Sequence, residues 1–247
     1  MFDKKMGRVM NKNKLKFLLP IRCIMFVLIF TIGACITKQN LADISNWWSP
    51  VATAVNVITV LIIFFAAKKS GLSYRELINY QKGKTKIPQI LLMIFLTLVI
   101  GTGGMYLAGF ICYGIIPYSP PMMIAPIHPV LAVLNFILLP LTVPFAEDGL
   151  YLGCGVNQFK NKFAAIFVPA FFYAVQHSFI PTLLDARFII YRFLSFLPLT
   201  IIFCWHYYKK RNPLPIMIAH AVIEIASVAM ILATSLNPEL YKIMCSM

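Results

Sequence analysis

Long apolar stretches recur along this chain and are separated by short polar segments. A helix needs about 20 mostly apolar residues to cross the ~30 Å hydrocarbon core of a bilayer. Strands of a membrane β-barrel would instead alternate in polarity over about ten residues, and the runs here are continuous. The pattern therefore predicts an all-α, polytopic transmembrane helix bundle of about seven spans, plus or minus one. The expected spans are 17–37, 50–67, 88–113, 129–159, 163–181, 193–208 and 213–236.

Composition supports this fold class. Of the 247 residues, 60% are hydrophobic and only 12% are charged, whereas soluble domains carry about 25% charged residues. A soluble enzyme and a disordered chain are therefore excluded. The six cysteines form no C-x-x-C pair, so neither a zinc ribbon nor a disulfide framework is indicated. We expect these cysteines to be small, buried, apolar side chains.

The distribution of the net charge of +14 indicates how the chain is oriented across the membrane. Lys and Arg collect in residues 1–16 and 68–87, near 160–162 and at 209–211. The expected outside segments hold only Lys38, Arg187, Arg192 and Lys242, while Arg22 lies within the first span. This bias predicts a cytoplasmic N-terminus and an outside C-terminus in a multi-pass cell-membrane protein, most simply in a bacterial plasma membrane. The lipid bilayer is thus an expected partner, and nucleic acid is not.

The polar segments divide the chain into five parts. We expect a basic cytoplasmic tail (1–16), two N-terminal spans (17–67), a basic loop with a surface helix (68–87), a membrane core (88–236) and a short C-terminal tail (237–247). Ser73 and Glu76 have the spacing of a capping box, which predicts the start of the surface helix. We expect the first span to be retained rather than cleaved as a signal sequence.

Five acidic residues and histidines make up most of the ionisable set inside the expected spans, where a charge costs ~2.5–3.5 kcal/mol on insertion scales and marks a candidate functional site. Counted along helices from the nearest basic loops at 1.5 Å per residue, three of them reach similar depths. These three are Glu147, His177 and His220. Asp148 adjoins the first, and Glu224 follows His220 by one helical turn.

Several chemistries suit such a group. A carboxylate beside a histidine could act as a general base on water, and a second histidine could stabilise an oxyanion. Glu147, His177 and His220 could instead bind a divalent metal such as zinc, although the H-E-x-x-H motif is absent from the sequence. A buried hydrogen-bonded cluster that joins helices, or a proton or ion pathway, would need the same residue types.

Three motifs in this region resemble the CPBP family of CAAX proteases and bacteriocin-processing (Abi) proteins. The family shows Glu-Glu-x-x-x-Arg, Phe-x-x-x-His and His-x-x-x-Asn/Asp on successive membrane helices. The corresponding stretches here run over 147–152, 173–177 and 220–224. The Pro-rich segment 212–216 and the segment 71–77 resemble the lead-in to the last motif and the surface helix of the family.

The resemblance implies an intramembrane endopeptidase that cleaves a membrane-associated protein or peptide precursor. It assigns water activation to Glu147 and His177 and oxyanion stabilisation to His220, with Asp148 and Glu224 in support. Metal dependence stays open. The sequence departs from the motifs where Asp148 replaces the second Glu, Leu152 replaces the Arg, and Glu224 replaces Asn or Asp. The alternative is a catalytically degenerate member that acts as a membrane immunity or scaffolding protein; a transporter is a third possibility.

Overall fold

The computed structural model describes residues 14–118 and 120–246. Within these residues, six helical segments are long and apolar enough to cross a membrane, which confirms a polytopic helical bundle. Most of the expected basic tail lies outside the described residues. The six spanning segments are η1 with α2 (Leu15–Leu18 and Ile21–Thr37), α4 (Trp48–Lys69), α6 (Ile87–Tyr113), α7 with its extensions (Pro129–Gln158), α9 (Ala186–Lys210) and α10 (Leu214–Leu236).

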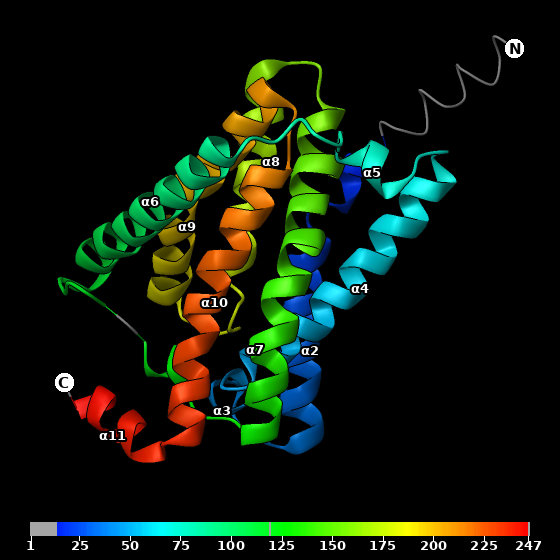
Figure 1. Ribbon diagram of the computed structural model, residues 1–247. Coiled ribbons are helices and arrows are strands. Elements are labelled where there is room, and N and C mark those ends of the chain that lie inside the picture. Colours follow the sequence, from blue (N-terminus) through cyan, green and yellow to red (C-terminus); the bar gives the residue numbers. More distant parts are fainter. Residues whose placement is uncertain (1–13, 119, 247) are drawn as a thin grey trace, which may run out of the picture.

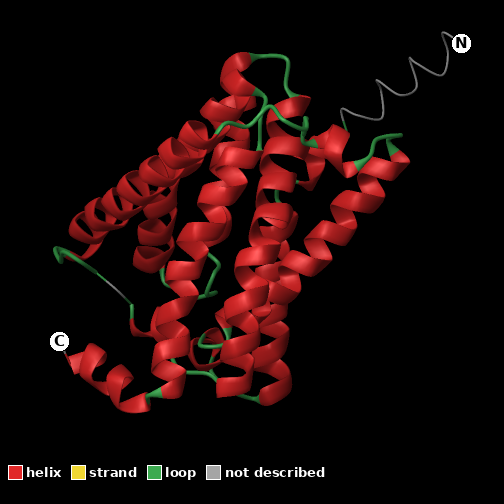
Figure 2. Ribbon diagram, in the orientation of Figure 1, coloured by secondary structure: helices red, strands yellow, loops and turns green. Residues whose placement is uncertain are grey.

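The central helix is α10. It packs against α7 on one side and against α6 on the other, while α9 packs between α6 and α8 (Lys162–His177). The helices α2 and α4 cover the side of α7 that faces away from α6 (Figure 1). Helices and connecting loops make up the described chain, as the colouring by secondary structure shows (Figure 2).

Apolar side chains cover the outside of the bundle. Helix α6 illustrates this distribution, because Leu92, Phe95 and Phe110 are exposed while Gly101 and Gly104 are buried. A Cβ atom at Gly104 would lie 2.5 Å from the backbone oxygen of Ser195, so glycine permits the close approach of α6 and α9. An apolar exterior around a polar interior is the arrangement expected in lipid.

The expected span 163–181 differs most from the observed structure. Helix α8 ends at His177, after only 16 residues, and an irregular loop continues to α9. Arg192 was assigned to an outside segment, whereas the structure includes it in α9 (Ala186–Lys210), one of the six segments long and apolar enough to cross a membrane. Its side chain is buried within α9 and donates to the backbone oxygens of His177 (3.2 Å) and Ile180 (2.8 Å). These bonds give donors to carbonyl groups near the end of α8, where the His177 oxygen also accepts from the Ile180 backbone N–H at 3.2 Å, as a buried non-helical segment requires.

Shorter elements lie at the ends of the bundle. The capping box of Ser73 and Glu76 is present and begins α5 (Tyr74–Leu77), as predicted. At the opposite end lie α3 (Leu41–Ser45), the 3-10 turn η2 (Pro121–Ile124) and α11 (Pro238–Ser246). All six cysteines are free, but Cys35 and Cys245 are exposed rather than buried.

Candidate active site

The segment that carries Glu147 and Asp148 departs from α-helical geometry. Helix α7 ends at Val143, and residues Pro144–Gly155 (η3) continue as a π-helix, in which each turn holds an additional residue and hydrogen bonds run from i to i+5. A short 3-10 turn (η4, Val156–Gln158) completes the segment. Every residue of η3 except Phe145 is buried. π-Helical turns occur frequently at functional sites.

The surface helix α5 holds η3 in place. The Tyr74 hydroxyl donates to the backbone oxygen of Phe145 at 2.7 Å, two residues before Glu147. Burial raises the pKa of Tyr74, so the phenol stays neutral and remains a donor. A Cβ atom at Gly149 would lie 2.5 Å from this hydroxyl, and glycine is therefore required for the contact.

Glu147, His177 and His220 converge from η3, α8 and α10, as the depth argument predicted. Glu147 Oε2 lies 3.7 Å from His177 Nε2 and 3.9 Å from His220 Nε2. All three residues are at most 6% exposed. These separations exceed a direct hydrogen bond and leave the carboxylate and both rings within reach of one shared water molecule.

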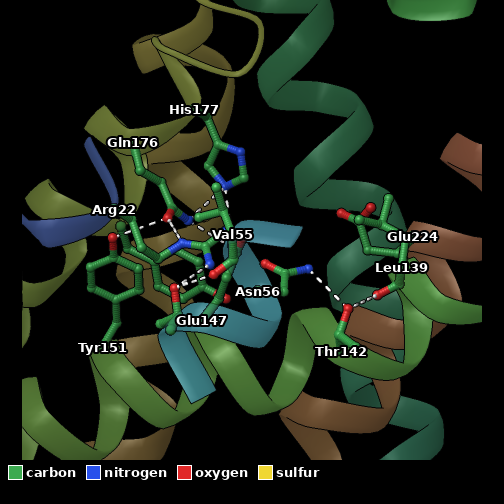
Figure 3. Close-up of polar contacts among 12 residues, drawn as sticks. Arg22, Val55, Asn56, Leu139, Thr142, Glu147, Tyr151, Gln176, His177 and Glu224 are labelled. Atoms are coloured by element: carbon green, nitrogen blue, oxygen red, sulfur yellow. Dashed lines mark hydrogen bonds and ion pairs between the residues drawn. The ribbon is translucent and has the colours of Figure 1, made fainter. Parts of the chain in front are cut away.

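Sequence reasoning missed the residues that hold Glu147. Arg22 of α2 donates from Nη2 to Glu147 Oε1 at 2.7 Å, and Gln176 donates from Nε2 to Glu147 Oε2 at 2.8 Å. Arg22 also contacts Gln176 Oε1 through Nε and Thr59 through Nη1, and Tyr151 donates to the same Gln176 oxygen. Figure 3 shows Arg22, Gln176 and Tyr151 around the Glu147 carboxylate. An arginine inside a span was an available signal, whereas an uncharged glutamine gave none.

Asp148 has a separate set of partners. The Tyr173 hydroxyl lies 2.9 Å from Asp148 Oδ1 and 3.0 Å from His220 Nδ1, and Asp148 Oδ2 lies 3.4 Å from the same ring nitrogen. Leucine stands at position 152 in place of the motif's arginine, and the structure places His220 beside Asp148. The Tyr173 hydroxyl oxygen and Asp148 Oδ2 both face His220 Nδ1 and favour a proton on this nitrogen. The Nε2 atom then donates a hydrogen bond when the ring is charged, and Asp148 stabilises that charge.

Glu224 lies on the other side of His220, with Oε1 at 3.8 Å from His220 Nε2. It borders a cavity of about 90 Å³ between α6, α8, α9 and α10, which is large enough for water. The polar side chains around the cavity are His177, His220, Glu224, Tyr173, Ser195, Thr200 and Ser227, and its other lining residues are apolar or glycine.

The ring of His177 is fixed by stacking. It lies 3.6 Å from the ring of Phe196, centroid to centroid, at an interplanar angle of 9°. The Arg192 guanidinium lies over the same Phe196 ring, 4.9 Å from its centroid. Arg192 thus contacts both the ring that supports His177 and the backbone of His177 itself. It is the second buried arginine, after Arg22, and the sequence analysis had used it only as a topology residue.

The contacts of Glu147 do not fit a metal site. Zinc needs ligand atoms at about 2.0–2.2 Å and lone pairs directed at the ion. Glu147 Oε1 accepts from the Arg22 guanidinium and Oε2 accepts from Gln176, and a positive charge in contact with a ligand opposes a cation. Among residues 14–118 and 120–246, no three His, Cys, Asp or Glu side chains are grouped as metal ligands.

A larger, polar cavity of about 460 Å³ lies elsewhere. It opens at the lysine-rich end of the bundle, between α5, η4 and the end of α9. Asn79, Asn157 and Arg211 line it. None of the five candidate residues borders this cavity.

Comparison with known proteins identifies the region that holds the site. Residues 129–226 match the family model of Rce1-like proteins, described as type II CAAX prenyl endopeptidase Rce1-like. The matched segment contains Glu147, Asp148, His177, His220 and Glu224, and it confirms the resemblance to the CAAX-protease family. No curated protein and no solved structure gives a significant match.

Proposed function

We propose that this multi-pass membrane protein with an Rce1-like segment is an intramembrane endopeptidase that hydrolyses a peptide bond of a membrane-associated substrate. One observation carries the proposal: a buried carboxylate oxygen of Glu147 lies 3.7 and 3.9 Å from the Nε2 atoms of two histidines. The family match, whose description names an endopeptidase, supports the same reaction class.

In the proposed reaction, Glu147 Oε2 and His177 Nε2 hold one water molecule, and Glu147 removes its proton as the oxygen attacks the peptide carbonyl carbon. The carbonyl oxygen becomes an oxyanion, towards which His220 donates from Nε2. When the C–N bond breaks, Glu147 returns the proton to the departing amine. The products are one carboxylic acid, which keeps the second proton of the water, and one amine, and no metal takes part.

The cavity of about 90 Å³ suggests how the substrate reaches the site. It meets the two histidines and Glu224, while Met105, Leu199 and Phe203 make other walls apolar. We infer that apolar residues flank the scissile bond, since polar ones would be desolvated without partners. Prenylated proteins and peptide precursors delivered within the membrane both satisfy this condition.

The experiment compares the peptide-cleavage rates of wild type, Glu147→Gln and His177→Ala. Each protein is reconstituted into liposomes, and peptides extracted from the membranes of the source cells serve as substrates. Each variant should lose at least about 100-fold in cleavage rate, because the general base or its water partner is removed. Glu239→Gln is the matched control, since Glu239 is an exposed glutamate of α11 that pairs with Lys242. Undiminished cleavage by Glu147→Gln would overturn the proposal.

A measurement in cells distinguishes a peptidase from a catalytically degenerate scaffolding or immunity protein. Comparative membrane peptidomics of cells that carry wild type or Glu147→Ala should show precursors that accumulate only in the variant. A scaffolding or immunity protein would keep its full biological function in the Glu147→Ala strain at equal protein abundance.

A further inference from the structure

The α2 residue Arg22 lies outside the Rce1-like segment and has no exposed surface. It is 125 residues from Glu147 in sequence, yet its Nη2 atom lies 2.7 Å from Glu147 Oε1. Burial of an arginine side chain is costly unless its charge is paired and its donors are satisfied. Its contacts therefore point to a specific partner rather than to a topology signal.

The arrangement of bonds shows what Arg22 does to the carboxylate. Because Oε1 is held by the guanidinium, Oε2 is the oxygen left facing His177 and His220. The Arg22 Nε atom contacts Gln176 Oε1, which orients the Gln176 amide so that its Nε2 donates to Glu147 Oε2. One guanidinium thus positions both the carboxylate and the amide that contacts it.

The η3 segment itself supplies no cation for Glu147, because residues 144–155 include neither lysine nor arginine. We propose that Arg22 is a positioning residue for Glu147, so that the first membrane helix is part of the active site. This inference rests on the proposed peptidase function. It also implies that the matched segment 129–226 alone lacks a component of the site.

The first test asks whether Arg22 orients the Glu147 carboxylate or only stabilises the packing of the helices, which we call bracing. Arg22→Met should lower kcat about 10–100-fold with KM changed by less than about twofold, as expected when a residue that orients a catalytic group is lost. Arg22→Lys keeps the charge and should recover part of kcat. Ser45→Ala is the matched control, because the buried Ser45 hydroxyl also joins the N-terminal helices to the core, through the Thr182 backbone oxygen at 2.6 Å, and it should leave kcat unchanged.

The second test is independent of catalysis. Thermal unfolding is measured for wild type, Arg22→Met, Glu147→Gln and the double variant in detergent. Removal of one partner leaves the other charge buried and unpaired, so the double variant should lose less in Tm than the sum of the two single losses. If Arg22→Met does not fold alone, Arg22→Gln, which is neutral but still forms hydrogen bonds, replaces it in both tests.

The outcomes are distinguishable. An unchanged kcat in Arg22→Met, or additive losses in Tm, overturns the role of Arg22. A wild-type protein that cleaves no peptide overturns the proposed function, while the Tm measurements still decide whether Arg22 holds Glu147. Equal losses of kcat in Arg22→Met and Ser45→Ala would show bracing of the bundle and would also overturn positioning.

Discussion

Tyr173 brings one phenolic hydroxyl between the carboxylate of Asp148 and the ring of His220, at 2.9 and 3.0 Å. Phenylalanine is the residue that the family resemblance expects at this position. The additional hydroxyl gives Asp148, which is shorter than glutamate, a partner that also reaches the histidine. A departure from the motif is thus matched by a second departure 25 residues away.

Tyr173→Phe should therefore lower kcat about tenfold, because His220 loses a contact that orients its ring, and should lower the free energy of unfolding by about 1 kcal/mol. Enzyme kinetics and thermal unfolding measure the two effects. Tyr191→Phe is the matched control, since the buried Tyr191 donates to the Tyr118 backbone oxygen at 3.1 Å, outside the site. Equal kcat in both variants would contradict a role in orientation.

Glu224 lies beside the position where the proposed oxyanion forms. Its Oε1 atom lies 3.8 Å from His220 Nε2, and a carboxylate repels an oxyanion whereas a carboxamide can donate to it. Glu224→Gln should raise kcat, by up to about tenfold. Steady-state kinetics with one purified substrate peptide measures this change. A loss of more than about tenfold would instead show that Glu224 takes part in proton transfer.

Single residues differ in how visible they are in the sequence. Glu147, His177 and His220 are ionisable groups within apolar runs, so the cost of burying them identified them. Arg22 and Arg192 carry the same cost, but Arg22 was noted only as lying within the first span, and Arg192 was counted as a topology residue. Gln176 and the Tyr173 hydroxyl bear no charge, and only the fold shows that they contact the candidate site.

At the level of elements, α5 and η3 form one packed unit through Tyr74 and Gly149. Gly149→Ala should destabilise the protein by about 1–3 kcal/mol, because the new methyl group would overlap the Tyr74 ring. The double variant Gly149→Ala with Tyr74→Ala should be less destabilised than the sum of the single variants. Thermal unfolding in detergent measures all three.

Gly103→Ala is the control for this prediction. A Cβ atom at Gly103 of α6 would meet nothing within 4 Å, so alanine should leave stability equal or raise it by up to about 1 kcal/mol. Strictly additive losses at positions 149 and 74 would mean that α5 and η3 do not depend on each other.

Element positions followed closely from the sequence, but two local geometries did not. Apolar runs predicted most helix bounds within about four residues, although α9 begins at Ala186 rather than at residue 193, and the capping box predicted α5. The π-helical geometry of η3 depends on packing around its buried residues, which hydropathy does not encode. The early end of α8 depends on Arg192, whose donors replace the hydrogen bonds of another helical turn.

For the whole molecule, charge asymmetry predicts orientation. The Lys-rich ends of α4 and α9 lie at the same end of the bundle as α5, and α11 lies at the opposite end (Figure 1). We expect the Lys-rich end in the cytoplasm, because basic residues are retained on that side.

Cysteine labelling in intact cells tests this orientation. In a variant that keeps Cys245 and has the other five cysteines replaced, an impermeant maleimide should label the exposed Cys245 without permeabilisation. In a matched variant with a cysteine only at position 83, which lies in the exposed basic loop, labelling should require permeabilised cells. The reverse labelling pattern would contradict this topology and would show that the Lys-rich end lies outside the cell.

The Tyr74–Gly149 contact also constrains how related sequences can diverge. Since a Cβ atom at position 149 would lie 2.5 Å from the Tyr74 hydroxyl, any larger residue there requires a smaller one at position 74. Positions 74 and 149 should therefore covary among homologues, although position 74 lies outside the Rce1-like segment. In a sequence alignment that includes the basic loop, this covariation would reveal the contact between α5 and the helix that carries Glu147.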